Sequence, residues 1–132
     1  MHTVIFACVH NAGRSQMAAA FFNHFADAKK ARAISAGTKP ATRVHSEVVE
    51  VMREVGIDLT SSSPQLLTDE LASGAQVLVT MGCGEACPFV SGLERVDWPL
   101  PDPKGQPLEG VRHIRDAVRD EVSRFLSKNG WL

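Results

Sequence analysis

Apolar residues recur along this chain with two different spacings, which predict alternating strands and helices. Short apolar runs are typical of buried strands, whereas apolar residues at every third or fourth position indicate one face of a helix. The predicted strands are Thr3–Cys8, Arg32–Ser35, Gln76–Met81 and Glu94–Trp98. The predicted helices are Arg14–Ala28, with Met17, Phe21, Phe22 and Phe25 on its buried face, Arg43–Val55, Gln65–Ala72 after an N-cap at Ser63-Pro64, and a terminal helix marked by Val111, Ile114, Val118, Val122, Phe125 and Leu126.

This alternation predicts the α/β class. We expect one domain over residues 1–132, with an open, mostly parallel four-stranded sheet flanked by helices on both faces. In such folds, ligands bind outside the carboxyl ends of the strands. Cys8, Cys83 and Asp102 follow the first, third and fourth predicted strands. These three residues should therefore lie at the same edge of the sheet.

Composition narrows the class of protein. The net charge is −1 and 44% of the 132 residues are apolar, so no basic face for nucleic acid and no polybasic membrane patch is expected. No apolar run approaches the ~20 residues of a membrane span and the N-terminus lacks a secretory signal, which favours a cytoplasmic protein. In a reducing compartment, the three cysteines are better interpreted as catalytic, redox or metal-binding than as a disulfide scaffold.

A cysteine and an arginine separated by five residues stand between the first strand and the first helix. The segment is Cys8-Val9-His10-Asn11-Ala12-Gly13-Arg14-Ser15. The backbone N–H groups of such a loop, together with the positive end of the helix dipole, form an anion cradle. Arg14 would bind a tetrahedral oxyanion through two hydrogen bonds. The positive electrostatic potential of the loop and Arg14 would also stabilise a reactive Cys8 thiolate. Residues 9–15 are therefore candidate anion-binding residues, and Cys8 is the candidate nucleophile.

Simpler interpretations of this segment are a buried structural cysteine and a solvated arginine at a helix start. The combined spacing disfavours both. The segment is not a Walker loop, because no Gly-Lys-Ser or Gly-Lys-Thr follows, and it lacks the glycine triplet of a dinucleotide fingerprint.

Cys83 and Cys87 lie close together in a second loop. Glycines at 82 and 84 give the backbone around Cys83 conformational freedom, which suits a shuttling thiol, and a thiol pair can close a disulfide by exchange. One alternative is half of a zinc site completed by His10 or Cys8, although no Cys-x-x-Cys pair is present and no metal is predicted. The other alternative is a pair of incidental loop cysteines.

Asp102 stands between two prolines, Pro101 and Pro103. A stiff loop of this kind can hold a carboxyl group over a site as a general acid, and partial burial would favour its protonated form. Pro-Asp-Pro is also common in ordinary turns. The catalytic interpretation therefore depends on Asp102 lying near Cys8.

Taken together, these residues resemble the arsenate reductases related to low-molecular-weight protein tyrosine phosphatases, over nearly the whole chain. The matching segments are 8–18, 34–37, 55–58, 79–83, 97–105 and 114–116. Reductases and phosphatases share the anion loop, whereas the distal cysteines indicate a reductase. Phosphatases of this fold often carry a second cysteine where this chain has Gly13.

The resemblance implies a mechanism for the first step. Cys8 attacks arsenate held by Arg14 and the loop amides, while Asp102 protonates the departing oxygen. Ser15 is expected to donate a hydrogen bond to the Cys8 thiolate, and Asn11 is expected to brace the loop backbone.

The resemblance also implies a thiol relay with no tightly bound cofactor. Cys83 attacks Cys8 and releases arsenite, then Cys87 attacks Cys83 and leaves a Cys83–Cys87 disulfide for thioredoxin to reduce. Three-thiol relatives commonly have a longer gap between the distal cysteines. Relatives with a similar Met-Gly-Cys-Gly loop use a low-molecular-weight thiol, so mycothiol or glutathione, with glutaredoxin, is the alternative external reductant.

Some relatives hold a potassium ion beside the anion loop. Ser35 and Asp58 match parts of that cation site, but Ala18-Ala19-Ala20 stands where those relatives have an acidic residue. The resemblance therefore predicts at most a weak potassium site.

Two other functions remain open at this point: a phosphatase on small aryl or protein phosphates, and a non-catalytic oxyanion or redox sensor.

Overall fold

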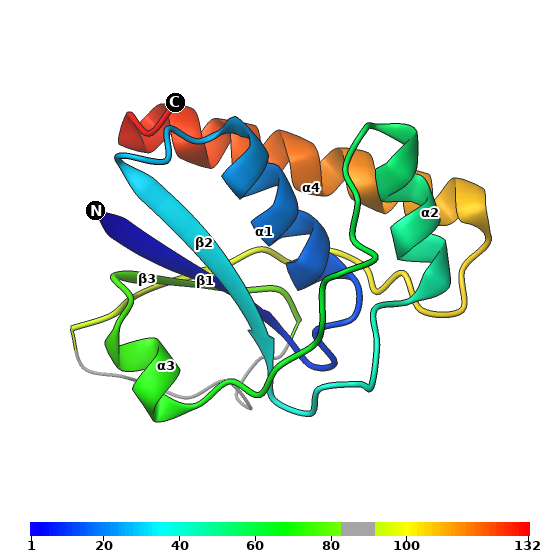
Figure 1. Ribbon diagram of the computed structural model, residues 1–132, viewed down its shortest axis with the longest axis horizontal. Helices are drawn as coiled ribbons and strands as arrows, with labels where there is room; N and C mark the ends of the chain where they lie inside the picture. The colour runs from blue at the N-terminus through cyan, green and yellow to red at the C-terminus, as the bar shows by residue number, and fades with distance from the viewer. Residues whose placement is uncertain (83–91) are drawn as a thin grey trace.

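A computed structural model of the protein describes residues 1–82 and 92–132. Its centre is a four-stranded parallel sheet in the order β2-β1-β3-β4 (Figure 1). The elements in chain order are β1 (His2–Cys8), α1 (Arg14–Phe25), β2 (Ala31–Gly37), α2 (Ser46–Glu54), α3 (Asp69–Ser73), β3 (Val77–Thr80), β4 (Glu94–Asp97) and α4 (Leu108–Asn129).

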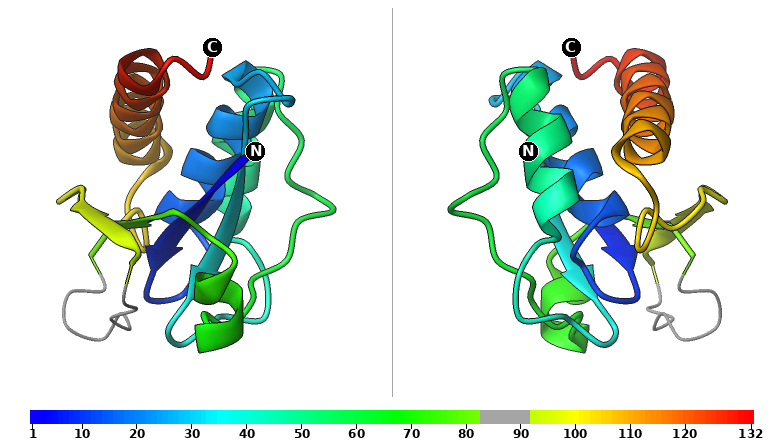
Figure 2. Two further views of the ribbon diagram at one scale, coloured as in Figure 1. Left: turned by 90° about the vertical axis from the view of Figure 1, so that its left-hand side faces the viewer. Right: turned by 90° about the vertical axis from the view of Figure 1, so that its right-hand side faces the viewer.

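The two central strands, β1 and β3, are buried on both faces of the sheet, as their continuous apolar runs require, whereas the edge strand β4 is largely exposed. Val4, Phe6 and Cys8 of β1 belong to a core that includes residues of α1, α2 and α4, whereas Ile5 and Ala7 pack on the opposite side with the smaller cluster around α3. Figures 1 and 2 show α3 across the sheet from the three longer helices. The predicted fold class, with helices on both faces, is confirmed.

The order of the strands reverses at β1. From β1 the chain runs through α1 to β2 on one side, then crosses to β3 on the other side of β1. Ligand sites of open α/β sheets form at such a reversal, outside the carboxyl ends of the strands. Cys8 is the last residue of β1 and therefore stands at this point.

The predicted helix Gln65–Ala72 is wrong in its first half. Residues 65–67 are extended, because the backbone of Gly37 donates to the Gln65 carbonyl and accepts from Leu67 N–H, beside a parallel bridge to Leu66. The helix starts only at Asp69, where the Thr68 hydroxyl accepts from Leu71 N–H. A tertiary strand contact therefore overrides the local Ser63-Pro64 signal.

Two other helices are shorter than predicted. The helix predicted from Arg14 to Ala28 ends at Phe25, and Phe25 is 38% exposed rather than part of the buried face. The helix predicted from Arg43 starts at Ser46, because His45 N–H is held by the Ala12 carbonyl. Strand limits differ from the predictions by at most two residues.

Within residues 1–82 and 92–132, no helix combines the length and the apolar character needed to cross a membrane.

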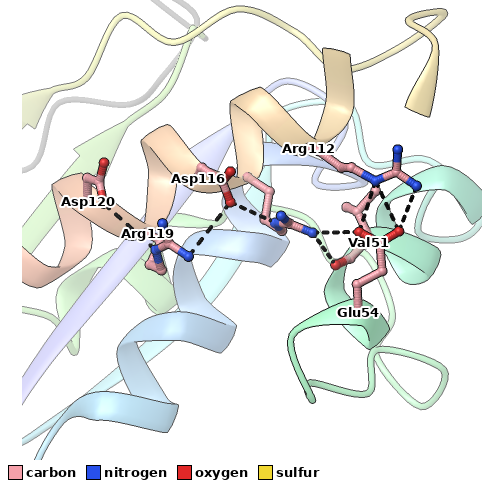
Figure 3. A network of polar contacts seen from close by, with 7 residues as sticks. Val51, Glu54, Arg112, Asp116, Arg119 and Asp120 are labelled. Carbon is pink, nitrogen blue, oxygen red and sulfur yellow. Dashed lines mark hydrogen bonds and ion pairs between the residues drawn. The ribbon is translucent and has the colours of Figure 1, made fainter. Parts of the chain in front are cut away.

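A polar network joins α2 to α4 on the side of the molecule that carries the longer helices (Figure 3). Glu54 accepts hydrogen bonds from Arg112 and from Arg115, whose Nη1 also donates to the Val51 carbonyl at 2.9 Å. Arg115 donates further to Asp116. The hydrogen bond from Arg112, with that from Arg115, lowers the pKa of Glu54 below its ordinary value of 4.5.

This network predicts a pH-dependent contribution of Glu54 to stability. The lowered pKa means that the Glu54 carboxylate stabilises the fold above pH 4.5, and that this contribution is lost as the pH falls through the pKa of the folded state. Glu54→Gln should therefore lower the free energy of unfolding at neutral pH, and its difference from wild type should shrink in acid. Urea denaturation across that range measures the difference. Glu121→Gln, which breaks one exposed pair with Arg124, is the matched control.

Candidate active site

The loop after β1 turns its carbonyl groups away from its centre. The carbonyls of Val9, His10 and Ala12 accept from the backbone N–H groups of Lys39, Ala41 and His45, at 2.8, 2.9 and 3.0 Å, respectively. In a trans peptide, the N–H points opposite to the C=O. The N–H groups that follow these carbonyls therefore point to the other side, where they can receive an anion.

Asn11 shapes the loop. Its φ is +51°, a left-handed conformation that asparagine tolerates better than most residues. Its side chain is buried and donates from Nδ2 to Ser15 Oγ at 2.7 Å. Ser15 Oγ lies 2.9 Å from Cys8 Sγ. Because Asn11 donates to the hydroxyl oxygen, the single hydroxyl hydrogen of Ser15 is available to Cys8, which is 3% exposed.

Arg14 closes the loop as the first residue of α1. Only 10% of its side chain is exposed, and Nη1 donates to the Leu100 carbonyl at 2.9 Å. Nη2 lies 3.8 Å from Asp102 Oδ2. Gly82, with φ of +99°, passes directly beside the guanidinium, where an added Cβ would collide with Nη1. The guanidinium is therefore held in one orientation by segments that follow β3 and β4.

Asp102 lies beside the anion loop, as its position after β4 predicted. One carboxylate oxygen accepts from Lys104 N–H at 3.0 Å and the other faces Arg14. The neighbouring Pro103 is buried against Gly13, where an added Cβ would lie 2.7 Å from the proline Cγ. The Asp102 side chain is 48% exposed, more than the partial burial expected of it.

Of the other predicted site residues, His10 is described by the structure and the two distal cysteines are not. His10 is part of the loop, and its Nδ1 lies 3.2 Å from the Lys39 carbonyl oxygen at an exposed position. Cys83 and Cys87 lie outside the described residues. Within residues 1–82 and 92–132, no group of three His, Cys, Asp or Glu side chains gathers to hold a metal.

Sequence reasoning gave no role to two glutamines that contact the site. Gln16 is buried next to Asn11, and Gln65 contacts Asn11 through its backbone N–H. Gln16 lies within the segment that carries the resemblance, so its position could have indicated a role. Gln65 gave no such signal, because its contact depends on a tertiary approach of the 59–67 segment.

Comparisons with known proteins agree with this architecture. The family model described as low molecular weight phosphotyrosine protein phosphatase matches residues 3–129. A putative arsenate reductase of Halobacterium salinarum is 43% identical over 122 residues, covering 89% of this chain and 85% of its own. The glutaredoxin arsenate reductase of Synechocystis sp. is 34% identical over 131 residues, covering 97% and 98%.

Solved structures give the same result. The thioredoxin-dependent arsenate reductase of Corynebacterium glutamicum aligns with a TM-score of 0.84 at 32% identity, over 97% of this chain and 61% of that longer one. Because the family model extends over nearly the whole length, from the first strand through the last helix, this chain belongs to the low molecular weight phosphotyrosine protein phosphatase family.

Proposed function

We propose that this protein is an arsenate reductase that uses Cys8 as its nucleophile. The observation that carries the proposal is the contact of Cys8 Sγ with Ser15 Oγ at 2.9 Å, inside a loop that Arg14 closes. Arsenate reductases with 43% and 34% identity over most of the chain support the choice of substrate. Arsenate matches the cradle because it is a tetrahedral oxyanion.

The first step forms a bond between Cys8 sulfur and arsenic(V). Arg14 and the loop N–H groups hold the arsenate oxygens, and Ser15 donates its hydroxyl hydrogen to the thiolate before attack. One arsenic–oxygen bond breaks, and Asp102 supplies the proton with which that hydroxyl leaves as water. Asp102 suits this role because it lies beside Arg14 and reaches solvent, from which it can regain a proton.

The second step transfers two electrons to arsenic. The Cys83 thiolate attacks Cys8 sulfur, the sulfur–arsenic bond breaks with its electron pair left on arsenic, and arsenite departs. Cys87 then attacks Cys83, frees Cys8 and forms a Cys83–Cys87 disulfide. We assign these roles from the sequence and the family resemblance. An external dithiol reduces that bond, and the reducing cytoplasm is the compartment that supplies it.

Two reductants compete for the last step. One relative is named a glutaredoxin arsenate reductase and another a thioredoxin-dependent one. We favour thioredoxin because this chain carries a second distal cysteine, Cys87, that can move the disulfide away from Cys8. The alternative is a small thiol, glutathione or mycothiol, that attacks the Cys8 adduct directly.

The relay predicts that Cys87→Ala loses arsenite release with thioredoxin, thioredoxin reductase and NADPH. The variant should complete one turnover at most, because its Cys8–Cys83 disulfide has no resolving thiol. Arsenite release and NADPH oxidation, followed together, measure this loss. Full multiple turnover in the variant would contradict the relay. Turnover restored by glutathione with glutaredoxin, or by mycothiol, would assign the reductant to that system.

Phosphate ester hydrolysis is the second candidate function. Hydrolysis of a phosphate ester needs a nucleophile in the anion loop and an acid, Asp102, that protonates the leaving group. It does not require the distal cysteines. Slow hydrolysis of a chromogenic aryl phosphate is expected in either case, because phosphate and arsenate share shape and charge. Hydrolysis far faster than arsenate reduction would make the phosphatase the main function.

A further inference from the structure

A polar pocket lies behind the anion loop, between α1, β2 and the 59–65 segment. Its lining residues include Gln16, Ala19, Ser35, Ser63 and Gln65, and none of the lining residues is acidic. This is where the family resemblance suggested a weak potassium site. Asp58, one of the matching residues, does not line the pocket. Its carboxylate accepts from the N–H and the hydroxyl of Thr60.

Four oxygen atoms beside this pocket already accept hydrogen bonds from the two glutamines. Gln16 Nε2 donates to the Asn11 carbonyl at 3.0 Å, to Asn11 Oδ1 at 3.3 Å and to the Ser63 carbonyl at 3.3 Å. Gln65 Nε2 donates to the Ser35 carbonyl at 2.8 Å, and Gln65 N–H donates to Asn11 Oδ1 at 2.9 Å. A bound potassium ion needs a shell of oxygen ligands, and these amide nitrogens cannot supply one. The residues present therefore do not fit a potassium ion.

We propose that Gln16 and Gln65 are positioning residues that brace the anion loop without a cation. Gln16 is 5% exposed and binds both the backbone and the side chain of Asn11. Asn11 in turn donates to Ser15, whose hydroxyl contacts Cys8. The Gln16 side chain and the Gln65 backbone N–H therefore fix the left-handed turn at Asn11 and, through it, the hydroxyl that faces the nucleophile, while the Gln65 side chain ties that segment to β2. The proposal rests on the proposed function only for its link to turnover.

The proposal can be tested by two measurements that do not depend on catalytic turnover. The first is the dissociation constant of inorganic phosphate and the second is the melting temperature, each in potassium chloride and in choline chloride at equal ionic strength. For wild type, we expect phosphate affinity to agree within about twofold between the two salts, and the melting temperature not to change. A wild-type protein that melts higher in potassium, or binds phosphate several-fold tighter in it, would overturn the proposal.

Gln16→Met tests the brace itself, because methionine keeps the length of the side chain and removes both donors. We expect phosphate affinity to fall about tenfold in both salts. The KM for arsenate should rise with it. Gln76→Met is the matched control. It removes a part-buried side-chain amide contact, the bond that Gln76 Oε1 accepts from Thr3 N–H near the start of β1, and should leave phosphate affinity unchanged.

A second variant keeps the test valid if Gln16→Met does not fold. Gln65→Met removes the bond to the Ser35 carbonyl at the exposed side of the pocket and keeps the backbone bond to Asn11, so a smaller loss of phosphate affinity is expected. Wild-type phosphate affinity in both folded variants would overturn the proposal. If the wild-type protein showed no arsenate turnover while these phosphate-binding results held, the proposed function would be overturned and the brace would stand.

Discussion

Replacing Cys8 with serine is expected to abolish arsenate reduction, lowering kcat/KM by about 10⁴-fold or more. The proposed mechanism needs a sulfur that both attacks arsenic and accepts attack from a second thiol, and a serine hydroxyl at the end of β1 can do neither. Arsenite release under saturating reductant measures the loss. The variant should still bind inorganic phosphate, because Arg14 and the loop N–H groups are unchanged.

Folding of the Cys8→Ser variant serves as the internal control. Cys8 is buried and contacts Ser15 Oγ, and a serine hydroxyl can keep that contact, so the melting temperature should remain close to that of wild type. A folded variant that retained substantial arsenite release would show that another residue is the nucleophile. It would refute the central assignment of the site.

Replacing Arg14 with lysine should lower kcat/KM by about 10²- to 10³-fold, although the positive charge remains. The guanidinium binds the Leu100 carbonyl, approaches Asp102 and fits the space left by Gly82. An ammonium group cannot make the same set of contacts and present two donors to an oxyanion at once. Steady-state kinetics and phosphate binding together measure the effect.

Arg124→Lys is the matched control for this change. Arg124 is 67% exposed on α4 and pairs only with Glu121 among the described residues, so its conservative replacement should leave kinetics unchanged. If Arg14→Lys behaved like this control, charge alone would explain anion binding. The geometric argument for the clamp would then fail.

The loop around Cys8 was predictable because its chemistry lies within eight consecutive residues, which a strand end and a helix start hold together. The approach of Asp102 was also predictable, since parallel strands bring their carboxyl ends to one edge. What the sequence could not supply was the partner of each polar group. The Leu100 carbonyl, which orients Arg14, carries no side-chain signal at all.

The segment at 63–67 shows why local signals failed elsewhere. Ser63-Pro64 is a good helix start in isolation, but pairing with Gly37 draws the chain into an extended path and brings Gln65 to Asn11. That pairing joins residues distant in sequence, so no local pattern encodes it. The same long-range approach creates the contacts of Gln65 with Asn11 and Ser35, which is why sequence reasoning missed them.

Pro103 packs closely on Gly13, so the two turns beside Cys8 constrain each other. The loop that follows Cys8 and the turn that carries Asp102 pack directly against each other, so a side chain gained at position 13 requires the proline ring to move. Phosphatases of this fold often carry a cysteine at that position. A substitution at position 13 would therefore reach Asp102 through the proline beside it, without touching the carboxylate itself.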